Sequence, residues 1–395
     1  MASFVDLSNG DFVPLSAALH GPDRVARALL IKGGMLVPPR PMLWPCPGEL
    51  LNGPHIEGDL HTPDVDLMVA RRVVAGGSGA HLKLDGQLVY AKGAYPYYIQ
   101  HWYQHDIARP AWDFDAPVTH RLDRAFVITH FNFVWGHWLT EMYPKLFVIR
   151  ALKAAGITAP LLLPRTAPSY AARIVRMMLP DQEIITYDPR DEAVEIGAAL
   201  LPHMLNRNYV FHDFMRWNLE REALSWTKGS GDEDMLFVSR GGVRTAQSFR
   251  ELENEAEIEG LAQEAGLTLV RPETLGWDQQ VRLFSRARLV AGEFGSGLHN
   301  ALLSPQGCQV VSLNWLVEVQ SRIGNFRRHD IGYILPADGQ ARLYSIEPQA
   351  NQPFTIDPAE FRQKLAIAVD RAQARKAMAG WDDAPFPVDA PTLRL

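Results

Sequence analysis

Residues 289–303 read LVAGEFGSGLHNALL. An apolar run from Leu289 to Ala291 leads into a turn that contains three glycines, and a short segment of helical character follows until Pro305. The run predicts a buried strand, and the glycines predict a tight turn that opens a helix. In doubly wound α/β domains such a junction lies at the carboxyl end of a strand, where ligands bind. This stretch therefore decides the fold predicted for the second half of the chain.

The sequence around this junction alternates between strand-like and helix-like segments. Strands are expected at 235–240, 267–272, 288–292 and 308–314, and helices at 251–265, 277–285, 297–303 and 361–378. Alternation of this kind is typical of a parallel sheet with helices on both faces. The second half is therefore predicted to be a doubly wound α/β domain.

The first half changes character near residue 120. Residues 1–120 have clustered prolines and glycines and short alternating runs, which predict a β-rich, irregular portion with long loops. Residues 120–225 then alternate as an α/β segment, in which Pro144 kinks or divides a helix expected over 137–153. Further elements are expected as strands at 124–129, 160–164 and 183–187 and as a helix at 169–178.

A polar, glycine-bearing linker at 224–234 marks the expected domain boundary. We expect an N-terminal domain over 1–225, a second domain over 226–350, and a C-terminal helix and tail over 351–395. The terminal helix either crosses back onto the first domain or pairs two chains, so the oligomeric state stays open.

Composition excludes several classes of protein. The chain has 395 residues, 47% of them hydrophobic and 21% charged, as in ordinary globular proteins. A net charge of −6 argues against a general nucleic-acid binder, and two cysteines make neither a zinc quartet nor a disulfide framework. The first residues do not resemble a signal peptide, and no apolar run has the roughly 18 residues of a spanning helix. We expect a soluble, cytoplasmic protein, and leave peripheral membrane contact open.

The glycine-rich turn has the chemistry of an anion site. Free N–H groups and the dipole at the start of a helix favour an anion, and glycines let the backbone approach it closely. The alternative is a tight turn that needs glycine at positive φ. The candidate residues of this turn are Glu293, Gly295, Ser296, Gly297, His299 and Asn300.

Two arginines follow the strand expected at 235–240. Arg240 and Arg244 are four residues apart at the mouth of the expected crevice, and each guanidinium can bind two phosphate oxygens. The alternative is a pair of solvated surface arginines. Glu255 either orients one of them or is an exposed helix residue, and we favour the exposed position.

His137 and Glu141 are i, i+4 on the expected helix and share one face. A histidine and a carboxylate so placed can abstract a proton together, while Trp135 and Trp138 can stack on a sugar. The alternative is a core histidine bonded to its helical neighbour.

Taken together, these motifs resemble glycosyltransferase family 61 over about residues 124–315. The family signature combines a Ser-Arg strand end, an Asn-Glu helix, a Pro-Glu strand end, a Gln-x-x-x-Phe helix and a glycine turn. Here these are Ser239-Arg240, Asn254-Glu255, Pro272-Glu273, Gln280 with Phe284, and Gly295-Ser296-Gly297. The upstream stretch NFVWGHWLTEMYPKL is similar to the family's N-terminal motif.

The resemblance implies a GT-B fold, in which two Rossmann-like domains face a cleft, and an inverting transfer that uses neither a metal nor another cofactor. It implies a nucleotide-sugar donor, with UDP favoured, and a saccharide acceptor in polysaccharide biosynthesis of the bacterial capsular or exopolysaccharide type. By the same resemblance, Arg240, Arg244 and the glycine turn neutralise the diphosphate and Glu273 lies near the nucleoside. Glu141 is then the base, and we expect His137 to assist it.

The glycine turn departs from the commoner family form, His-Gly-Ala-Gly-Leu-Thr-Asn. Phe294 replaces the histidine and His299 replaces the threonine, so His299 or Glu293 is expected to take over the imidazole's role. Alternatives are a non-catalytic glycan-binding protein on a decayed transferase scaffold and a nucleotide-sugar epimerase. A metal-dependent transferase would use one of three Asp-x-Asp tripeptides, and zinc would use His101 and His105 with a third ligand that is not evident.

Overall fold

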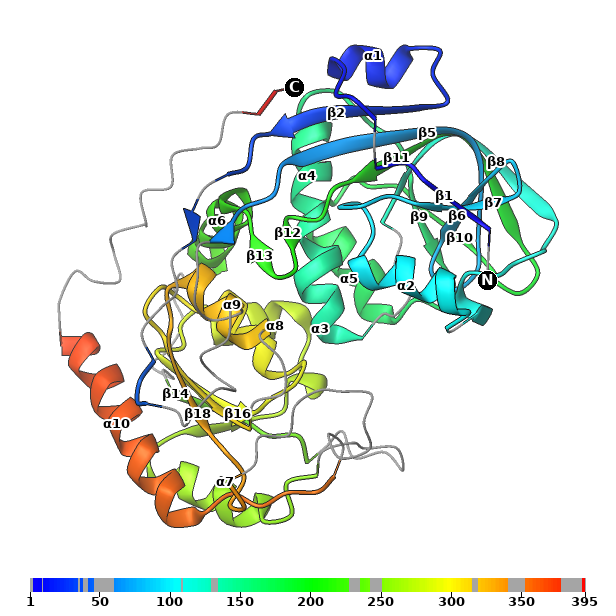
Figure 1. Ribbon diagram of the computed structural model, residues 1–395. Helices are drawn as coiled ribbons and strands as arrows, with labels where there is room; N and C mark the ends of the chain where they lie inside the picture. Colours follow the sequence, from blue (N-terminus) through cyan, green and yellow to red (C-terminus); the bar gives the residue numbers. More distant parts are fainter. Residues whose placement is uncertain are drawn as a thin grey trace. The chain divides into compact units, whose positions relative to one another are not determined.

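The computed structural model describes residues 3–8, 10–34, 36–37, 42–45, 60–107, 109–128, 134–226, 235–241, 251–314, 319–339, 352–377 and 393–394. The chain forms two compact units (Figure 1). The first unit comprises Met1–Met35, Thr62–Asn208 and Ala390–Leu395, and the second comprises Leu36–His61 and Tyr209–Asp389. Each unit is therefore assembled from separate stretches of sequence.

The first unit is built on one nine-stranded mixed sheet, in the order β1-β7-β6-β5-β11-β8-β9-β10 with β2 paired to β5. The central strands β5 and β11 run antiparallel, whereas β8 runs parallel to both β11 and β9. The sheet thus joins the β-rich N-terminal residues to the α/β segment that follows them. Its strands are Phe4–Asp6 (β1), Val25–Ile31 (β2), Val65–Gly76 (β5), His81–Leu84 (β6), Gln87–Tyr90 (β7), Val118–Val127 (β8), Leu161–Pro164 (β9), Ile184–Tyr187 (β10) and Ala193–Pro202 (β11).

Helices connect the parallel strands of this sheet. The helix α5 occupies Ser169–Met178 between β9 and β10, as its apolar spacing predicts, with Ala171, Ile174, Val175 and Met178 buried. The helix expected over 137–153 is divided, which confirms the effect predicted for Pro144. The unit's helices are Leu15–His20 (α1), Tyr97–His105 (α2), Arg109–Ala111 (η1), Trp135–His137 (α3), the π-helical turn Trp138–Met142 (η2), Tyr143–Ala154 (α4) and α5.

The second unit contains a five-stranded parallel sheet in the order β15-β14-β16-β17-β18. This order confirms the doubly wound α/β domain predicted for the second half. It reverses direction between β14 and β16, and ligands of such sheets bind at that switch point, beyond the carboxyl ends of the strands. The strands are Met235–Val238 (β14), Thr268–Val270 (β15), Leu289–Glu293 (β16), Gln309–Leu313 (β17) and Asp330–Ile334 (β18).

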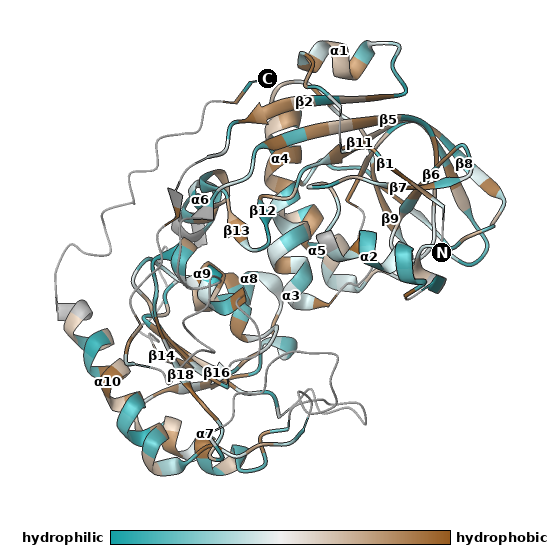
Figure 2. Cartoon of the chain, viewed as in Figure 1, coloured by the Kyte–Doolittle hydropathy of each residue, from teal (hydrophilic) through white to brown (hydrophobic). Residues whose placement is uncertain are grey.

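One face of this sheet is covered by α7 and α10. Alternate strand residues such as Leu289 and Ala291, which project to the same face, share a buried core with Ile258 of α7 and Phe361 of α10. Figure 2 shows hydrophobic and hydrophilic residues mixed along α10. The unit's helices are Asp213–Trp226 (α6), Glu255–Glu264 (α7), Pro272–Thr274 (η3), Trp277–Phe284 (α8), Leu298–Leu303 (η4), Val319–Arg327 (α9) and Pro358–Ala377 (α10).

A segment from the proline-rich N-terminal part adds to the edge of this sheet. Met42 bridges Ile331 of β18, and the Leu43 amide donates to the Ile331 carbonyl at 2.7 Å. The indole Nε1 of Trp44 donates to the Tyr333 carbonyl at 3.0 Å, and its ring lies where a Cβ on Gly332 would stand. The short strands Leu36–Val37 (β3) and Leu60–His61 (β4) pair with each other on either side of this segment.

Some boundaries differ from the sequence expectation. The helix expected from residue 251 begins at Glu255, and the helix expected over 297–303 is a short 3-10 helix, η4. The units divide between Asn208 and Tyr209, before α6, whereas the expected linker at 224–234 lies partly outside the described residues. The remaining short strands are Asn206–Arg207 (β12) and Val210–Phe211 (β13).

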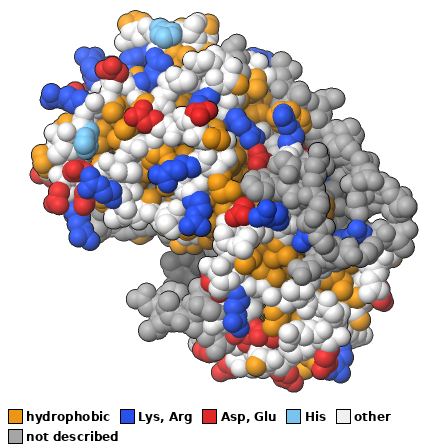
Figure 3. Space-filling view, turned by 180° about the vertical axis from the view of Figure 1, so that it is seen from behind, with side chains coloured by type: hydrophobic (Ala, Val, Ile, Leu, Met, Phe, Trp, Pro, Cys, Tyr) orange, Lys and Arg blue, Asp and Glu red, His pale blue; other side chains and the backbone are white. Residues whose placement is uncertain are grey.

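Charges are interspersed on the face seen in Figure 3, where basic side chains lie beside acidic ones. This distribution fits a chain with a net charge of −6. Among the described residues, none of the helices combines the length and the apolar character that crossing a membrane requires.

The Trp44 contact gives a prediction about stability. Trp44 is 7% exposed and belongs to the core shared by the sheet and α10. Replacing Trp44 with Ala should lower the free energy of unfolding of the second unit by about 3–5 kcal/mol, because it leaves a cavity and removes the hydrogen bond to the Tyr333 carbonyl. Urea unfolding followed by circular dichroism measures this loss.

The matched control is Trp44→Phe, which keeps most of the apolar area and loses only the indole hydrogen bond. It should cost clearly less than the alanine variant. If both variants unfold at the wild-type urea concentration, the N-terminal segment does not contribute to the core of the second unit.

Candidate functional site

In the first unit, Glu141 is the centre of a small polar cluster. Its carboxylate is nearly buried, with the residue 3% exposed. One oxygen, Oε1, lies 3.0 Å from His137 Nδ1, and the other, Oε2, accepts a hydrogen bond of 3.1 Å from the Tyr98 hydroxyl. The same hydroxyl lies 3.4 Å from His137 Nδ1. The structure therefore brings together the two residues predicted from the sequence and adds Tyr98 from α2.

The backbone that carries Glu141 is a π-helical turn, and Pro144 explains it. In a regular helix the Thr140 carbonyl would accept from the amide of residue 144, but proline has no N–H and its ring crowds that carbonyl. The helix widens over η2, and the side chain of Asn206 donates to the Thr140 carbonyl at 2.6 Å. Turns of this kind are frequent at functional sites.

Electrostatics couple His137 to Glu141. Burial acts to lower the pKa of His137, but the charge of Glu141 and its hydrogen bond raise that pKa above the ordinary value. His137 is therefore readily protonated next to an ionised Glu141. The imidazole and the carboxylate therefore interact directly, and both are groups that serve as general acids or bases in proteins.

The tryptophans beside this pair differ in position. Trp138 is fully buried, and its ring meets Tyr170 edge-on with centroids 5.8 Å apart. This burial excludes the sugar-stacking role considered for Trp138. Trp135 is half-buried and also contacts Tyr170, with centroids 5.1 Å apart.

In the second unit, the predicted donor-binding residues gather at the switch point of the parallel sheet. Arg240 follows the carboxyl end of β14, Glu273 follows that of β15, and the glycine turn follows β16. Because β14 lies between β15 and β16, these three strand ends are neighbours. Their convergence is the one that the resemblance implies for a nucleotide site.

Arg240 is held between two carboxylates. Its backbone amide donates to Glu255 Oε1 at 3.2 Å, and its Nη1 lies 3.9 Å from Glu293 Oε2. The guanidinium carbon lies 3.8 Å from the place where a Cβ on Gly295 would stand. Within the described part of the chain, the buried Nη1 has no hydrogen-bond partner. A cationic donor is thus kept at the switch point with bonding capacity to spare.

Glu255 corrects one expectation. It is buried at the start of α7 and accepts from the Arg240 amide, rather than being exposed as we favoured. It therefore fixes the backbone that carries the arginine.

The glycines of the turn meet different constraints. Gly292 and Gly295 have φ of +154° and +157°, which L side chains rarely adopt, and a Cβ on Gly292 would lie 2.5 Å from the Val238 carbonyl. A Cβ on Gly297 would lie 3.0 Å from Val238 Cγ1, so this glycine lets the turn pack under β14. The glycines are therefore consistent both with a tight turn and with the close approach of Arg240 to the turn.

The helix after this turn differs from the α-helix that was expected to form an anion site there. The segment η4 is a six-residue 3-10 helix, so its dipole is weaker than that of the α-helix expected there. Asn300 is fully buried, and its Nδ2 donates to Gln280 Oε1 at 3.0 Å. Gln280 in turn donates to the Pro272 carbonyl at 2.9 Å, so Asn300 braces the turn that carries Glu273.

The other predicted residues differ in exposure. His299 is 9% exposed, and its ring meets Phe294 edge-on with centroids 5.6 Å apart. Ser296 is half-buried and Glu273 is exposed. Arg244 lies outside the described residues.

Three of the described aspartates that were considered as metal ligands form hydrogen bonds with basic side chains. Asp64 accepts from Lys32 at 3.0 Å, Asp66 from Arg27 at 2.7 Å and Asp113 from Arg109 at 2.8 Å. The third tripeptide, 232–234, is outside the described residues. Among the residues that are described, no group of three or more His, Cys, Asp or Glu is placed to hold a metal ion.

Sequence reasoning missed two residues beside the candidate sites. Tyr98 reaches Glu141 from a helix 43 residues upstream, and only the density of aromatic residues in YPYYIQHWY marks that helix. Arg271 precedes the Pro-Glu motif, and its Nη2 lies 3.5 Å from the place of a Cβ on Gly241. These sequence neighbours do not show that either residue lies beside a candidate site, because that placement depends on the tertiary fold.

Comparisons with known proteins agree with the geometry. A family model described as Glycosyltransferase 61 matches residues 135–311, from the helix that carries His137 and Glu141 to β17. No curated protein matches the chain. The matched segment contains all eleven residues predicted from the sequence as catalytic or donor-binding, from His137 to Asn300.

The coupling of His137 to Glu141 can be measured without any substrate. In Glu141→Gln the charge that raises the His137 pKa is lost while burial remains, so that pKa should fall below its ordinary value of about 6.5. NMR titration of the imidazole resonances measures it. His101, exposed on α2, is the internal control, and its resonances should be unaffected by the substitution. An unchanged His137 titration would show that the pair is not coupled.

The bracing role of Asn300 predicts a coupled loss of stability. Asn300→Ala should lower the free energy of unfolding by about 1–3 kcal/mol, because Gln280 is left buried without its amide partner. A double-mutant cycle with Gln280→Ala should give a coupling energy of about 0.5–3 kcal/mol. Ser296→Ala, in the same turn, should stay within about 0.5 kcal/mol of the wild type. Additive losses for Asn300 and Gln280 would contradict the brace.

Proposed function

The chain carries a glycosyltransferase family 61 domain over residues 135–311 and is a glycosyltransferase, and from this premise we propose which transfer it performs. It moves a sugar from a nucleotide sugar, UDP-linked by preference, to a hydroxyl group of a saccharide acceptor. The transfer inverts the anomeric centre and uses no metal ion. It serves polysaccharide biosynthesis in the cytoplasm.

The observation that carries the donor half of this proposal is Arg240. Its buried Nη1 has no hydrogen-bond partner in the described part of the chain, and it lies at the switch point of a doubly wound sheet. Arginine binds phosphate oxygens in pairs, and charge-assisted bonds of this kind are stronger than neutral ones. A diphosphate beside the glycine turn supplies the missing acceptors, and Arg244 is proposed to reach the same group.

The acceptor half rests on Glu141. The acceptor oxygen attacks the anomeric carbon, its proton goes to the Glu141 carboxylate, and the bond from that carbon to the diphosphate oxygen breaks. The electron pair of this bond leaves on the diphosphate, whose growing charge Arg240 stabilises. His137 and Tyr98 hold the two carboxylate oxygens at 3.0 and 3.1 Å, which fixes the direction of proton transfer.

The proposal includes the GT-B arrangement that the family resemblance implies. The mixed sheet of the first unit then serves the acceptor, and the parallel sheet of the second serves the nucleotide, each in the unit where its residues lie. Glu293 is proposed to orient Arg240, and His299 to stand near the place of the family's usual histidine, packed on Phe294.

Thermal shift measurements test the donor class. UDP, GDP, CMP and dTDP are each added in excess EDTA, and UDP is expected to raise the melting temperature most. A ligand at one hundred times its Kd adds about 2.7 kcal/mol of stability. Arg240→Ala and Arg244→Ala should each lose this shift, whereas Arg282→Ala, an exposed arginine of α8 paired with Asp278, should retain it.

The outcomes separate the competing hypotheses. A shift that needs magnesium would replace the metal-independent mechanism by a metal-dependent one. The absence of a shift with every nucleotide, with or without magnesium, would instead favour a glycan-binding protein on a decayed scaffold. Conversion of the donor sugar without an acceptor would indicate an epimerase.

A second prediction concerns the base. Glu141→Gln should lower kcat by about 10²–10⁴-fold, the usual effect of losing a general base, while the UDP-induced thermal shift remains. Turnover is followed as UDP release from the UDP-sugar. Glu192→Gln, in the same unit, is the control and should keep full activity. A Glu141→Gln enzyme with wild-type kcat would remove Glu141 from the chemistry.

A further inference from the structure

Lys145 is a wholly buried lysine that the proposed mechanism does not use. It lies in the first turn of α4, four residues after Glu141 along the same continuous helical stretch. None of the residue is exposed, and its Nζ donates a hydrogen bond of 2.6 Å to the Ala94 carbonyl. That carbonyl is its one hydrogen-bond partner among the described residues.

Burying an ammonium group is costly unless an opposite charge faces it. One neutral carbonyl does not balance the charge of Lys145. Burial lowers the pKa of Lys145 to about 7, and the charge of Glu141 acts in the opposite direction, favouring the protonated form. A hydrophobic residue of similar length would avoid the cost altogether. The position is therefore better explained by an electrostatic role than by packing alone.

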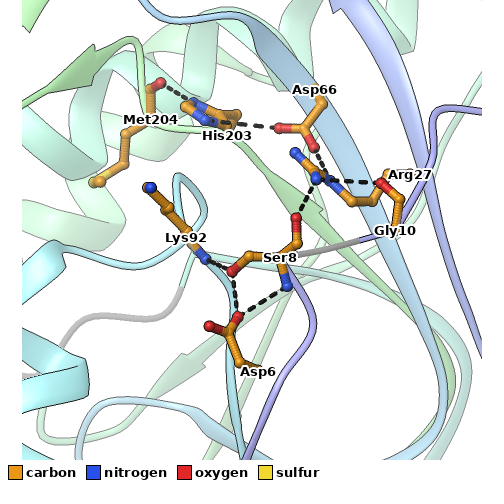
Figure 4. Close-up of polar contacts among 8 residues, drawn as sticks. All are labelled: Asp6, Ser8, Gly10, Arg27, Asp66, Lys92, His203 and Met204. Atoms are coloured by element: carbon orange, nitrogen blue, oxygen red, sulfur yellow. Dashed lines mark hydrogen bonds and ion pairs between the residues drawn. The ribbon is translucent and has the colours of Figure 1, made fainter.

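A second group of charges interacts with Lys145, and Figure 4 draws His203, Asp66 and Arg27 from this group. His203, at the end of β11, feels the positive charge of Lys145 and is itself buried. Its Nε2 lies 3.7 Å from Asp66, whose other oxygen accepts from Arg27 at 2.7 Å. Burial lowers the pKa of His203 in spite of Asp66, so His203 is neutral near pH 7.

These contacts show which neighbouring group can balance the positive charge of Lys145. Asp66 is engaged by Arg27 and is therefore not free to balance the lysine. His203 supplies no charge when neutral. Of the groups that face Lys145, Glu141 is the one whose negative charge favours its protonated form.

We propose that Lys145 is a positioning residue for the transfer reaction, whose ammonium group keeps the nearly buried Glu141 carboxylate ionised. The inference rests on the proposed function, since it assumes that Glu141 is the base. It extends that function by naming the group that makes a buried carboxylate able to accept a proton.

The physical need for such a group follows from burial. A carboxylate that is 3% exposed tends to take up a proton, because desolvation disfavours its charged form. His137 balances it only while protonated, and Tyr98 contributes a hydrogen bond without charge. Lys145 adds a positive charge, and its interaction with Glu141 favours the charged form of both groups.

The test is a direct measurement of Glu141 ionisation. The full-length protein is labelled with ¹³C at the glutamate carboxyl carbons, and the Glu141 resonance is assigned by its loss in Glu141→Gln. In Lys145→Gln, which can still donate to the Ala94 carbonyl, the Glu141 midpoint should rise by about 1–3 pH units. Lys145→Arg keeps a cation and should titrate within about one pH unit of the wild type.

Lys153→Gln is the matched control, because it removes a half-buried lysine two turns further along the same helix. It should leave the Glu141 midpoint unchanged. Circular dichroism establishes that each variant is folded, and Lys145→Met serves if the glutamine variant is not. A Glu141 midpoint in the neutral, folded variant that equals the wild-type value overturns the proposal.

Activity distinguishes this inference from the proposed function. With the UDP-sugar as donor and water as acceptor, the acid limb of the kcat/KM profile of Lys145→Gln should move to higher pH with the Glu141 midpoint. A loss of rate at all pH values without movement of that limb would indicate a merely structural lysine and would overturn the inference. If Glu141→Gln keeps full turnover, it is the base assignment, and hence the proposed function, that fails.

Discussion

A charge withdrawn from water must face a partner, and both groups of candidate residues are organised by this constraint. In the first unit, Glu141 is surrounded by His137, Tyr98 and Lys145. In the second, Arg240 lies between Glu255 and Glu293 but keeps one buried donor atom without a bond in the described residues. In the first group, a nearly buried carboxylate faces a histidine and a hydroxyl group. In the second, Arg240 Nη1 has an ion-pair partner in Glu293 but makes no hydrogen bond in the described residues.

The position of Glu141 depends on one proline. Pro144 removes an amide from the helix, the turn before it widens, and Asn206 satisfies the carbonyl that is left over. Without this turn, His137, Glu141 and Lys145 would follow regular helical spacing around the axis. A residue that usually ends helices thus sets the geometry of the candidate base.

Sequence reasoning succeeded where the signal is local. The helix Ser169–Met178 has four buried apolar residues at helical spacing, and the strand–turn–helix at 289–303 has glycines where the backbone needs them. The effect of Pro144 on its helix was also predictable, because proline lacks the N–H that a regular helix needs.

Sequence reasoning failed where tertiary contacts determine the position of a residue. Glu255 is buried because the Arg240 amide needs an acceptor, and Asn300 faces Gln280 because η4 packs on α8. Tyr98 reaches Glu141 from a helix 43 residues away in sequence, and no spacing in the sequence encodes that approach. The mixed pairing itself arises because β5 and β11, which are distant in sequence, lie antiparallel at the centre of the sheet.

The edge contact of Trp44 has a consequence for how the protein is made. The indole and the carbonyl that it meets are 289 residues apart, so the ribosome releases the tryptophan long before β18 exists. Contacts of such long range form slowly, because the intervening chain must first be ordered. The second unit therefore closes late, after most of the chain has emerged. During synthesis an aromatic segment remains exposed, and it is this stretch that a chaperone would have most reason to shield.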